Sequence, residues 1–333
     1  MTSTDPSLNA ADTAATPAPP DRSVVQDVNR AITHGGSPAE QRAAAEVRAL
    51  LAPALGDRTD GGPPVSVVDI GANPLDDDAP YALLLASGAA RVTGFEPQVE
   101  ALAELRRRAG PHETYLPHVV GDGRTGTLHL CASPGFAGLF EPDPDQLQVL
   151  IDFPGLAAVV DTEQVATRRL DDIEEIQQID LLKIDIQGGE LAVLQAGRRA
   201  LSEVVAVQTE VGFHRLYRDQ PTFADVDLEL RSQGLVPHRF VATRTWPMAP
   251  VQWADPLELA SRQLVEADVL YVRDPARAEL LSDGQLARTA LIADVGYGSF
   301  GLALRCVLEL VRRGVLDPES ENRYRALAAQ RLG

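Results

Sequence analysis

Apolar residues follow two patterns along the chain: short β-branched runs and longer amphipathic stretches. Residues 65–70 read Val-Ser-Val-Val-Asp-Ile, a run typical of a buried strand. Runs of similar character predict strands at residues 65–70, 91–95, 115–120, 181–186, 204–209, 235–243 and 268–272. Apolar groups spaced i, i+3, i+4 and i+7, with helix start and stop signals, predict helices at residues 38–53, 78–88, 99–109, 190–196 and 223–233.

This alternation of strands and helices predicts a parallel sheet, because the connection between parallel strands usually crosses one face of the sheet as a helix. We therefore expect an α/β fold with a Rossmann-like, seven-stranded, mostly parallel sheet and helices on both faces. The last two strands are expected to form an antiparallel edge. Residues 277–332 read as two or three helices, with a buried stripe at Leu302, Leu304, Val307, Leu308 and Val311.

The chain divides into four expected segments. Residues 1–22 are rich in Thr, Ala, Pro and Asp and offer little apolar surface to bury, which predicts a disordered tail. Residues 23–60 are expected to form an N-terminal helical extension. The main domain then spans residues 61–275, and residues 276–333 form a C-terminal helical extension.

Composition excludes several classes of partner. The formal net charge of −18 opposes binding to nucleic-acid phosphates or to an anionic membrane surface. The two cysteines, Cys131 and Cys306, lie far apart and outside any metal-binding spacing, so we expect reduced thiols. No apolar run reaches the roughly 18 residues of a membrane span, and no secretion signal is recognisable. These features predict a soluble, cytoplasmic protein that binds no nucleic acid.

The first strand of the main domain ends in Asp69, and the turn that follows contains Gly71 and Asn73. Ligands of open α/β folds bind at this carboxyl edge of the sheet. Glycine lets the backbone approach a ligand, and a carboxylate can bind a cationic amino-acid group. A dinucleotide site would need G-x-G-x-x-G, whereas Pro74 and three aspartates at 76–78 follow here, which argues against NAD or FAD. An ordinary strand-to-turn junction remains the alternative.

Two further strand ends carry carboxylates. Glu96 ends the second strand, where an acidic side chain can accept hydrogen bonds from both ribose hydroxyls. Asp122 follows the third strand and could accept a hydrogen bond from an adenine amino group. A solvated strand-end glutamate and a plain Gly-Asp-Gly turn are the alternatives.

The most specific segment is residues 180–190, which contain Lys183 and Asp185 in an otherwise apolar strand. Side chains two residues apart on a strand point to the same face. Buried charges need a partner or a ligand, so either an internal ion pair or a reaction site would explain them. Lys183 is also the only lysine of the sequence.

Taken in order, these motifs resemble the FkbM-type family of class I S-adenosylmethionine-dependent methyltransferases. Its pattern couples an Asp-Ile-Gly-Ala-Asn turn, a Phe-Glu-Pro strand end and a Lys-Ile-Asp-x-x-Gly-x-Glu segment. The stretches 159–172 and 208–234 are similar as well, so the resemblance covers about residues 65–240. Two places depart from the family pattern: Pro74-Leu75, where glycine is frequent, and Gln187, where Glu is commoner.

The resemblance implies a class I methyltransferase fold for residues 61–275 and S-adenosylmethionine as the cofactor. The residues expected to bind it are Asp69, Gly71, Asn73, Glu96 and Asp122. The resemblance also implies O-methylation of a hydroxyl on a sugar, a polyketide or a similar small molecule or glycan. A non-catalytic S-adenosylmethionine-binding or interaction protein is the alternative, and an NAD-dependent oxidoreductase is a further one.

For the reaction, Asp185 is expected to orient or deprotonate the acceptor hydroxyl. Lys183 would lower the pKa of that hydroxyl or hold an acceptor oxygen, and Glu210 would add a polar contact. Glu210 and His214 could suggest a metal site with Asp185, but a strand end with Gly212 between them does not give ligand geometry, so no metal is expected.

Overall fold

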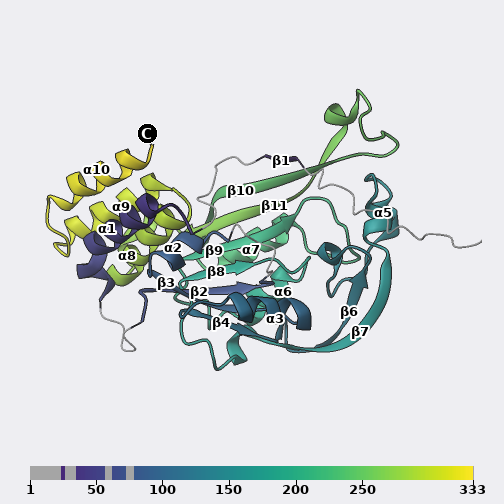
Figure 1. Ribbon diagram of the computed structural model, residues 1–333, viewed down its shortest axis with the longest axis horizontal. Helices are drawn as coiled ribbons and strands as arrows, with labels where there is room; N and C mark the ends of the chain where they lie inside the picture. The colour runs from purple at the N-terminus through teal and green to yellow at the C-terminus, as the bar shows by residue number, and fades with distance from the viewer. Residues whose placement is uncertain (1–23, 27–34, 57–61, 73–78, 333) are drawn as a thin grey trace, which may run out of the picture.

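The β-branched runs assemble into one eight-stranded sheet at the centre of the molecule (Figure 1). Its strands in spatial order are β1 (Val24–Gln26), β10 (Leu235–Pro247), β11 (Arg262–Arg273), β9 (Ala206–Gly212), β8 (Leu181–Ile184), β2 (Val65–Ile70), β3 (Ala90–Phe95) and β4 (Glu113–Leu116). The strands from β4 to β9 run parallel, whereas β11 runs antiparallel to both β9 and β10. The expected seven-stranded, mostly parallel sheet with its antiparallel edge is therefore confirmed.

The computed structural model describes residues 24–26, 35–56, 62–72 and 79–332. Several features expected from the sequence lie outside these residues: the tail at 1–22, Asn73, the Pro74-Leu75 departure and the helix start at Asp78. The eighth strand, β1, pairs antiparallel with β10. The segment 23–60 was expected to be helical, but a short stretch of it, β1, forms a strand that extends the sheet.

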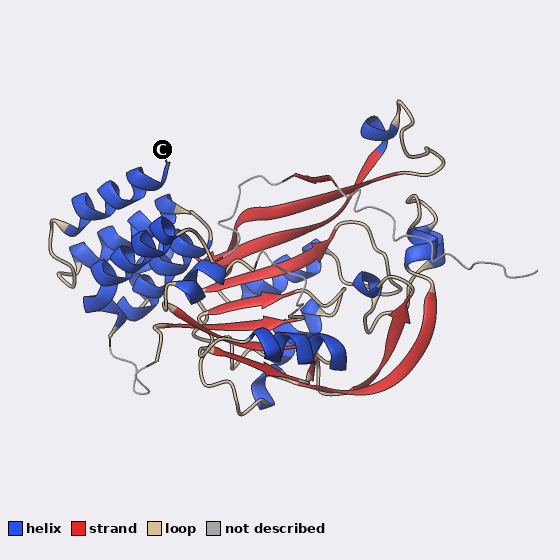
Figure 2. Cartoon of the chain, in the orientation of Figure 1, coloured by secondary structure: helices blue, strands red, loops and turns tan. Residues whose placement is uncertain are grey.

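Helices cover both faces of the sheet (Figure 2). Apolar side chains of α6 (Glu190–Ala196) and α7 (Phe223–Ser232) share one core with Val68 and Ile70 of β2. Val65 and Val67 belong to a second core on the opposite face. All six residues of β2 are buried, as expected of a strand covered on both sides.

The second core contains the helices of both ends of the chain, which gather in one group in Figure 1. They are α1 (Pro38–Leu55), α2 (Ala82–Ala86), α8 (Asp283–Leu291), α9 (Phe300–Arg312) and α10 (Ser320–Leu332). Ser37 and Glu40 close a capping box at the start of α1. On α9 the buried stripe consists of Leu302, Ala303, Cys306, Val307 and Leu310. Leu308, expected inside, is 38% exposed, because the buried face is rotated from the expected one.

A second, three-stranded sheet was not expected from the sequence. It consists of β5 (Val119–Val120), β7 (Val159–Arg168) and β6 (Thr125–Cys131), with β7 in the middle. The strand expected at 115–120 is divided between the two sheets, as β4 and β5. Between β6 and β7 lie the short helices η1 (Pro134–Phe136), α4 (Pro144–Leu147) and α5 (Phe153–Leu156). Helix α3 (Val99–Arg108) packs against β4.

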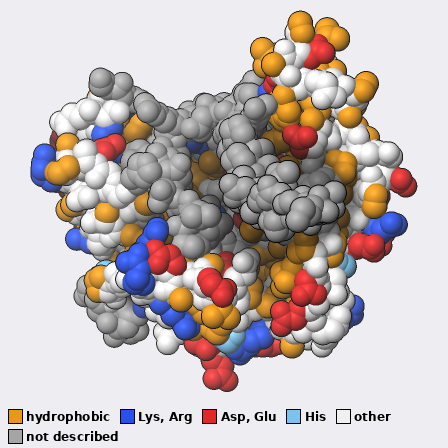
Figure 3. All heavy atoms as spheres, turned by 45° about the vertical axis from the view of Figure 1, so that its right-hand side comes forward, with side chains coloured by type: hydrophobic (Ala, Val, Ile, Leu, Met, Phe, Trp, Pro, Cys, Tyr) orange, Lys and Arg blue, Asp and Glu red, His pale blue; other side chains and the backbone are white. Residues whose placement is uncertain are grey.

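Strands β10 and β11 continue past the sheet as a projecting hairpin (Figure 1). At its end lies the short helix η3 (Glu258–Ser261), and hydrophobic side chains are prominent on this lobe at the upper right of Figure 3. Cys131 and Cys306 are buried free thiols. Among the described residues, no helix combines the length and hydropathy that a membrane crossing requires.

The shared core predicts that the C-terminal helices unfold together with the sheet. Leu286 on α8 is fully buried in the core that contains β2, so Leu286→Ala should lower the free energy of unfolding by about 2–5 kcal/mol. Leu308→Ala, on the exposed side of α9, should cost less than about 1 kcal/mol. Urea unfolding followed by circular dichroism measures both. A second transition that only the Leu286 variant shifts would contradict the shared core.

Candidate functional site

The ends of three parallel strands meet at one edge of the sheet. Ile70 of β2 lies in register with Phe95 of β3 on one side and with Ile184 of β8 on the other. The turn after β2 is closed by Gly71, whose φ of 83° lies in the left-handed region. A Cβ atom at Gly71 would collide with the carbonyl oxygen of Asp185. Glycine is therefore required here by both conformation and space.

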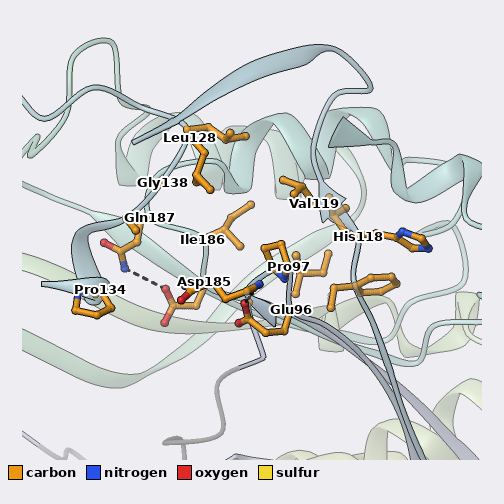
Figure 4. A pocket seen from close by; sticks show the side chains of 18 of the residues that line it. Glu96, Pro97, His118, Val119, Leu128, Pro134, Gly138, Asp185, Ile186 and Gln187 are labelled. Atoms are coloured by element: carbon orange, nitrogen blue, oxygen red, sulfur yellow. Dashed lines mark hydrogen bonds between the residues drawn. The ribbon is translucent and has the colours of Figure 1, made fainter. Parts of the chain in front are cut away.

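A cavity of about 230 Å³ opens at this edge (Figure 4). Asp185 and Gln187 lie toward one end of it and His118 toward the other, with Glu96 and Pro97 between them. The second sheet and its insertion supply the remaining wall: Val119, Val120, Leu128, Leu130, Pro134, Gly135, Ala137, Gly138 and Leu139. The cavity is thus mostly apolar, with carboxylates at its middle and at one end.

Glu96 is the buried carboxylate in the middle of the cavity wall, 7% exposed. Burial raises its pKa above the ordinary value, and a hydrogen bond of 2.7 Å from the Gln98 N–H opposes that rise. Hydrogen bonds from hydroxyl groups, such as those of a ribose, would stabilise the ionised form of this buried carboxylate. Glu96, which the sequence led us to expect as a cofactor-binding residue, therefore lies in the wall of the cavity.

Asp122 lies elsewhere. Its side chain is exposed and accepts a hydrogen bond of 2.9 Å from the Arg124 N–H. Asp122 is not among the described residues that line the cavity, whereas His118 and Val119 are. The His118 ring is held by a contact of 2.8 Å with the Arg168 guanidinium. An adenine at this end would meet these side chains rather than the Asp122 carboxylate.

Asp69 and Lys183 form a buried cross-strand ion pair. The two residues are register partners on β2 and β8, and Lys183 Nζ lies 3.2 Å from Asp69 Oδ1. The Tyr81 hydroxyl donates a hydrogen bond to the other carboxylate oxygen. Neither charge is among the described residues lining the cavity. The internal ion pair considered from the sequence thus exists, but its acid is Asp69 instead of Asp185.

Gln187 joins the two remaining candidate carboxylates. Its amide nitrogen donates to Asp185 at 3.3 Å and to Glu210 at 3.1 Å. Its amide oxygen accepts a hydrogen bond of 2.9 Å from the Tyr217 hydroxyl. A φ of 57° places Gln187 in the left-handed region, an unfavourable conformation that is concentrated at functional sites. An amide suits this position better than a carboxylate. A glutamate here would face the carboxyl groups of Asp185 and Glu210 and could not donate a hydrogen bond to either when ionised.

Glu190 completes a cluster of three carboxylates with Asp185 and Glu210, whose oxygens lie within 4.8 Å of one another. Burial raises the pKa of Glu190 to about 7, and that of Glu210 rises well above its usual range, chiefly through burial and then through the charge of Asp185. His214 is turned away, with Nε2 at 3.2 Å from the Gln146 carbonyl oxygen. The absence of a metal stays a prediction.

Sequence reasoning missed several parts of this site. Tyr81 and Tyr217 hold the carboxylate and the amide described above, yet an isolated tyrosine gives no signal in a single sequence. Tyr217 did lie within the stretch that resembles the family. The apolar wall from β6 and its insertion was also missed, because residues 124–158 carry no motif.

Comparison with known proteins identifies a matching family and several similar proteins. The pattern of the Methyltransferase FkbM domain matches residues 69–236, half of the chain. The chain is 29% identical over 177 residues to the 2-O-methyltransferase NoeI of Sinorhizobium fredii (strain NBRC 101917 / NGR234), covering 49% of this chain and 70% of that protein.

Solved structures of low sequence identity are also similar in part. The magnesium protoporphyrin IX methyltransferase ChlM from Synechocystis PCC 6803, with bound SAM, has 14% identity and a TM-score of 0.34 over 71% of this chain and 80% of that chain. Methyltransferase FkbM from Methylobacillus flagellatus KT has 18% identity and a TM-score of 0.34 over 62% of this chain and 43% of that chain.

The raised pKa of Glu190 predicts a pH-dependent contribution to stability. Between the unfolded value of 4.5 and the folded value of about 7, the folded protein binds a proton that the unfolded chain has lost. The stabilising contribution is therefore complete below about pH 4.5 and is lost as the pH rises through about 7. Glu190→Gln should remove this pH dependence, because an amide does not titrate. At about pH 8, where the parent protein must hold a buried ionised carboxylate, the variant should be more stable by up to about 3 kcal/mol.

Urea unfolding at about pH 5 and pH 8 measures this difference. Gln keeps an oxygen acceptor for the N–H groups of Ile186 and Gly188, which lie 2.8 and 3.3 Å from Glu190 Oε1. Glu190→Ala removes that acceptor and should be less stable than Glu190→Gln at both pH values. If Glu190→Gln and the parent protein lost stability equally with pH, the assigned proton would be wrong.

Proposed function

The chain belongs to the FkbM methyltransferase family and uses S-adenosylmethionine, and from this premise we propose that it methylates a hydroxyl oxygen of a sugar, a polyketide or a similar small molecule or glycan. The observation that carries the proposal is the cavity that runs from His118 past the buried Glu96 to Asp185. The similarity to a 2-O-methyltransferase supports oxygen as the methylated atom. We place the reaction in the cytoplasm, in keeping with the two free thiols.

The residues that line the cavity suit this cofactor in their chemistry. The Gly71 backbone lines the cavity, Glu96 would accept the ribose hydroxyls, and His118 with Val119 would border the adenine. When bound, S-adenosylmethionine supplies a methyl group on a positively charged sulfur. Transfer of that methyl group to the acceptor oxygen would leave a neutral thioether, and the hydroxyl proton would pass to a residue of this chain.

Asp185 is the residue that we propose for the acceptor proton. It lines the cavity at the end toward Gln187, and its carboxylate is held there by the Gln187 amide. Glu210 holds the same amide from the other side and is therefore a positioning residue. Most of the rate acceleration in such a displacement comes from aligning the reactants, with the proton acceptor adding to it.

The buried ion pair changes the roles that we propose for Asp69 and Lys183. They pair with each other and are not among the described residues that line the cavity, so we assign them to holding β2 and β8 in register at the edge where the turn begins. Neither is assigned a contact with cofactor or acceptor. A nicotinamide-dependent oxidoreductase, considered from the sequence, does not agree with the family.

Glu96→Gln should weaken the binding of S-adenosylhomocysteine by about tenfold, because a charged acceptor of the ribose hydroxyls is lost. Titration calorimetry measures the affinity. Glu100→Gln makes the same charge change at an exposed site in the first turn of α3 and should leave the affinity unchanged. Equal affinity of the Glu96 variant and the parent protein would refute the placement of the ribose.

Asp185→Asn should lower methyl transfer by about 100-fold or more, because amide nitrogen cannot accept the acceptor proton. Turnover is measured as the formation of S-adenosylhomocysteine from S-adenosylmethionine in the presence of each member of a panel of simple glycosides and phenols. Affinity for S-adenosylhomocysteine should be retained, which separates a lost base from a lost fold. Unchanged turnover in the variant would exclude this role. If the parent protein bound the cofactor product but methylated nothing in the panel, a non-catalytic binding protein would be favoured.

A further inference from the structure

A second cavity, of about 180 Å³, lies beside the cofactor cavity and shares two of its wall residues, Gly135 and Gln187. Its other walls come from the insertion before β7, from the loop after β9 and from the projecting hairpin: Phe136, Phe153, Leu156, Leu216, Arg244, Thr245, Trp246, Val265 and Glu266. We propose that this cavity is the acceptor site, and that it takes a single six-membered ring that carries the hydroxyl and bears no negative charge. The proposal rests on the methyltransferase function above.

The shared wall places the second cavity on the reacting side of the first. Gln187 borders both cavities and donates a hydrogen bond to Asp185, the proposed proton acceptor. A ring in the second cavity can therefore present a hydroxyl past Gln187 toward Asp185. His118, at the opposite end of the cofactor cavity, does not line the second cavity.

The volume of the second cavity suits one ring. An apolar cavity of about 150 Å³ in another protein holds one benzene molecule. About 180 Å³ therefore offers room for one six-membered ring with small substituents. The rest of a larger acceptor would have to remain outside this cavity.

Aromatic side chains form a fixed apolar wall. The Phe153 ring centroid lies 5.0 Å from that of Phe136 and 4.9 Å from that of Trp246. Trp246 is anchored by a hydrogen bond of 2.8 Å from its ring nitrogen to the Ile151 carbonyl oxygen. A wall of this kind packs against the flat face of a ring, whether aromatic or saturated, at little entropic cost.

Charge at the polar side of the cavity selects against anions. The Arg244 guanidinium lies 3.5 Å from Glu210, 3.5 Å from Glu266 and 3.1 Å from Asp268. One cation thus faces the carboxylates of Glu266 and Asp268, while Glu210 tends to hold a proton because burial raises its pKa well above the usual range. Asp185 adds a further carboxylate on the other side of Gln187. A phosphate or carboxylate on the acceptor would meet this surplus of negative charge, whereas a neutral ring would not and an ammonium group would be attracted.

Three methyl glucosides that differ only at carbon 6 test the proposal: the parent sugar with its hydroxyl, the 6-amino-6-deoxy sugar and the uronic acid. Trp246 and Trp253 are the two tryptophans of the sequence, so Trp253→Phe leaves Trp246 as the reporter of the cavity. Its fluorescence is titrated with each sugar in the presence of saturating S-adenosylhomocysteine. A pH of about 8 keeps Glu266 ionised, since burial raises its pKa to about 7, and keeps the amine protonated.

We expect the amino sugar and the parent sugar to change the fluorescence, and the uronic acid to bind at least about tenfold more weakly than the amino sugar. Glu266→Gln should reduce that ratio by about threefold or more. Glu258→Gln removes a charge from the same hairpin outside the cavity and should leave the ratio unchanged. The affinity for S-adenosylhomocysteine should be the same in all variants.

Two results would overturn the proposal: a uronic acid that binds as tightly as the amino sugar, or no fluorescence change with any of the three sugars up to about 50 mM. Both leave the proposed function standing as long as S-adenosylhomocysteine binds and methyl transfer to another acceptor is observed. Failure of the function itself would appear separately, as a protein that releases no S-adenosylhomocysteine with any acceptor. If Glu266→Gln did not fold, the ranking of the three sugars on the Trp253→Phe protein would still decide.

Discussion

The close approach of Gly71 to the Asp185 carbonyl oxygen is the constraint on which the site depends. No side chain fits between these two residues, and the Asp185 N–H donates to the Ile70 carbonyl oxygen on the same turn. The cofactor turn after β2 and the acidic segment after β8 are thereby fixed to each other by backbone contacts. The buried pair of Asp69 and Lys183, two positions before Gly71 and Asp185, holds the same register by charge. The Gly71 turn and Asp185, the proposed proton acceptor, lie at these two strand ends.

Much of the fold could be predicted from the sequence because its signals are local. Strand β2 is an unbroken buried run, and α6 begins and ends where residues 190–196 predicted it. The second sheet could not be predicted in the same way. Strand β7 is mostly exposed, with polar residues such as Asp161 and Glu163, so it carries no buried run. Its strand form comes from pairing with β6 rather than from its own pattern.

The candidate site, too, could be predicted from the sequence only where its signals are local. Glu96 and Asp185 follow recognisable strands, and the structure brings both into one cavity. Lys183 was expected to act together with Asp185, because alternation along a strand puts them on one face. The strand ends at Ile184, however, so the alternation stops before Asp185 and the two side chains find different partners. Trp246 and Phe136 meet only through the fold, because they come from segments far apart in the sequence.

The burial of Lys183 also affects how this protein can be modified. It is the only lysine of the sequence, it is 7% exposed, and its ammonium group is engaged with Asp69. Reactions that require an accessible, uncharged lysine amine, such as acetylation, attachment of ubiquitin or labelling with active esters, therefore have no ready side-chain target on the folded chain. Arginine carries the remaining positive charge of the sequence.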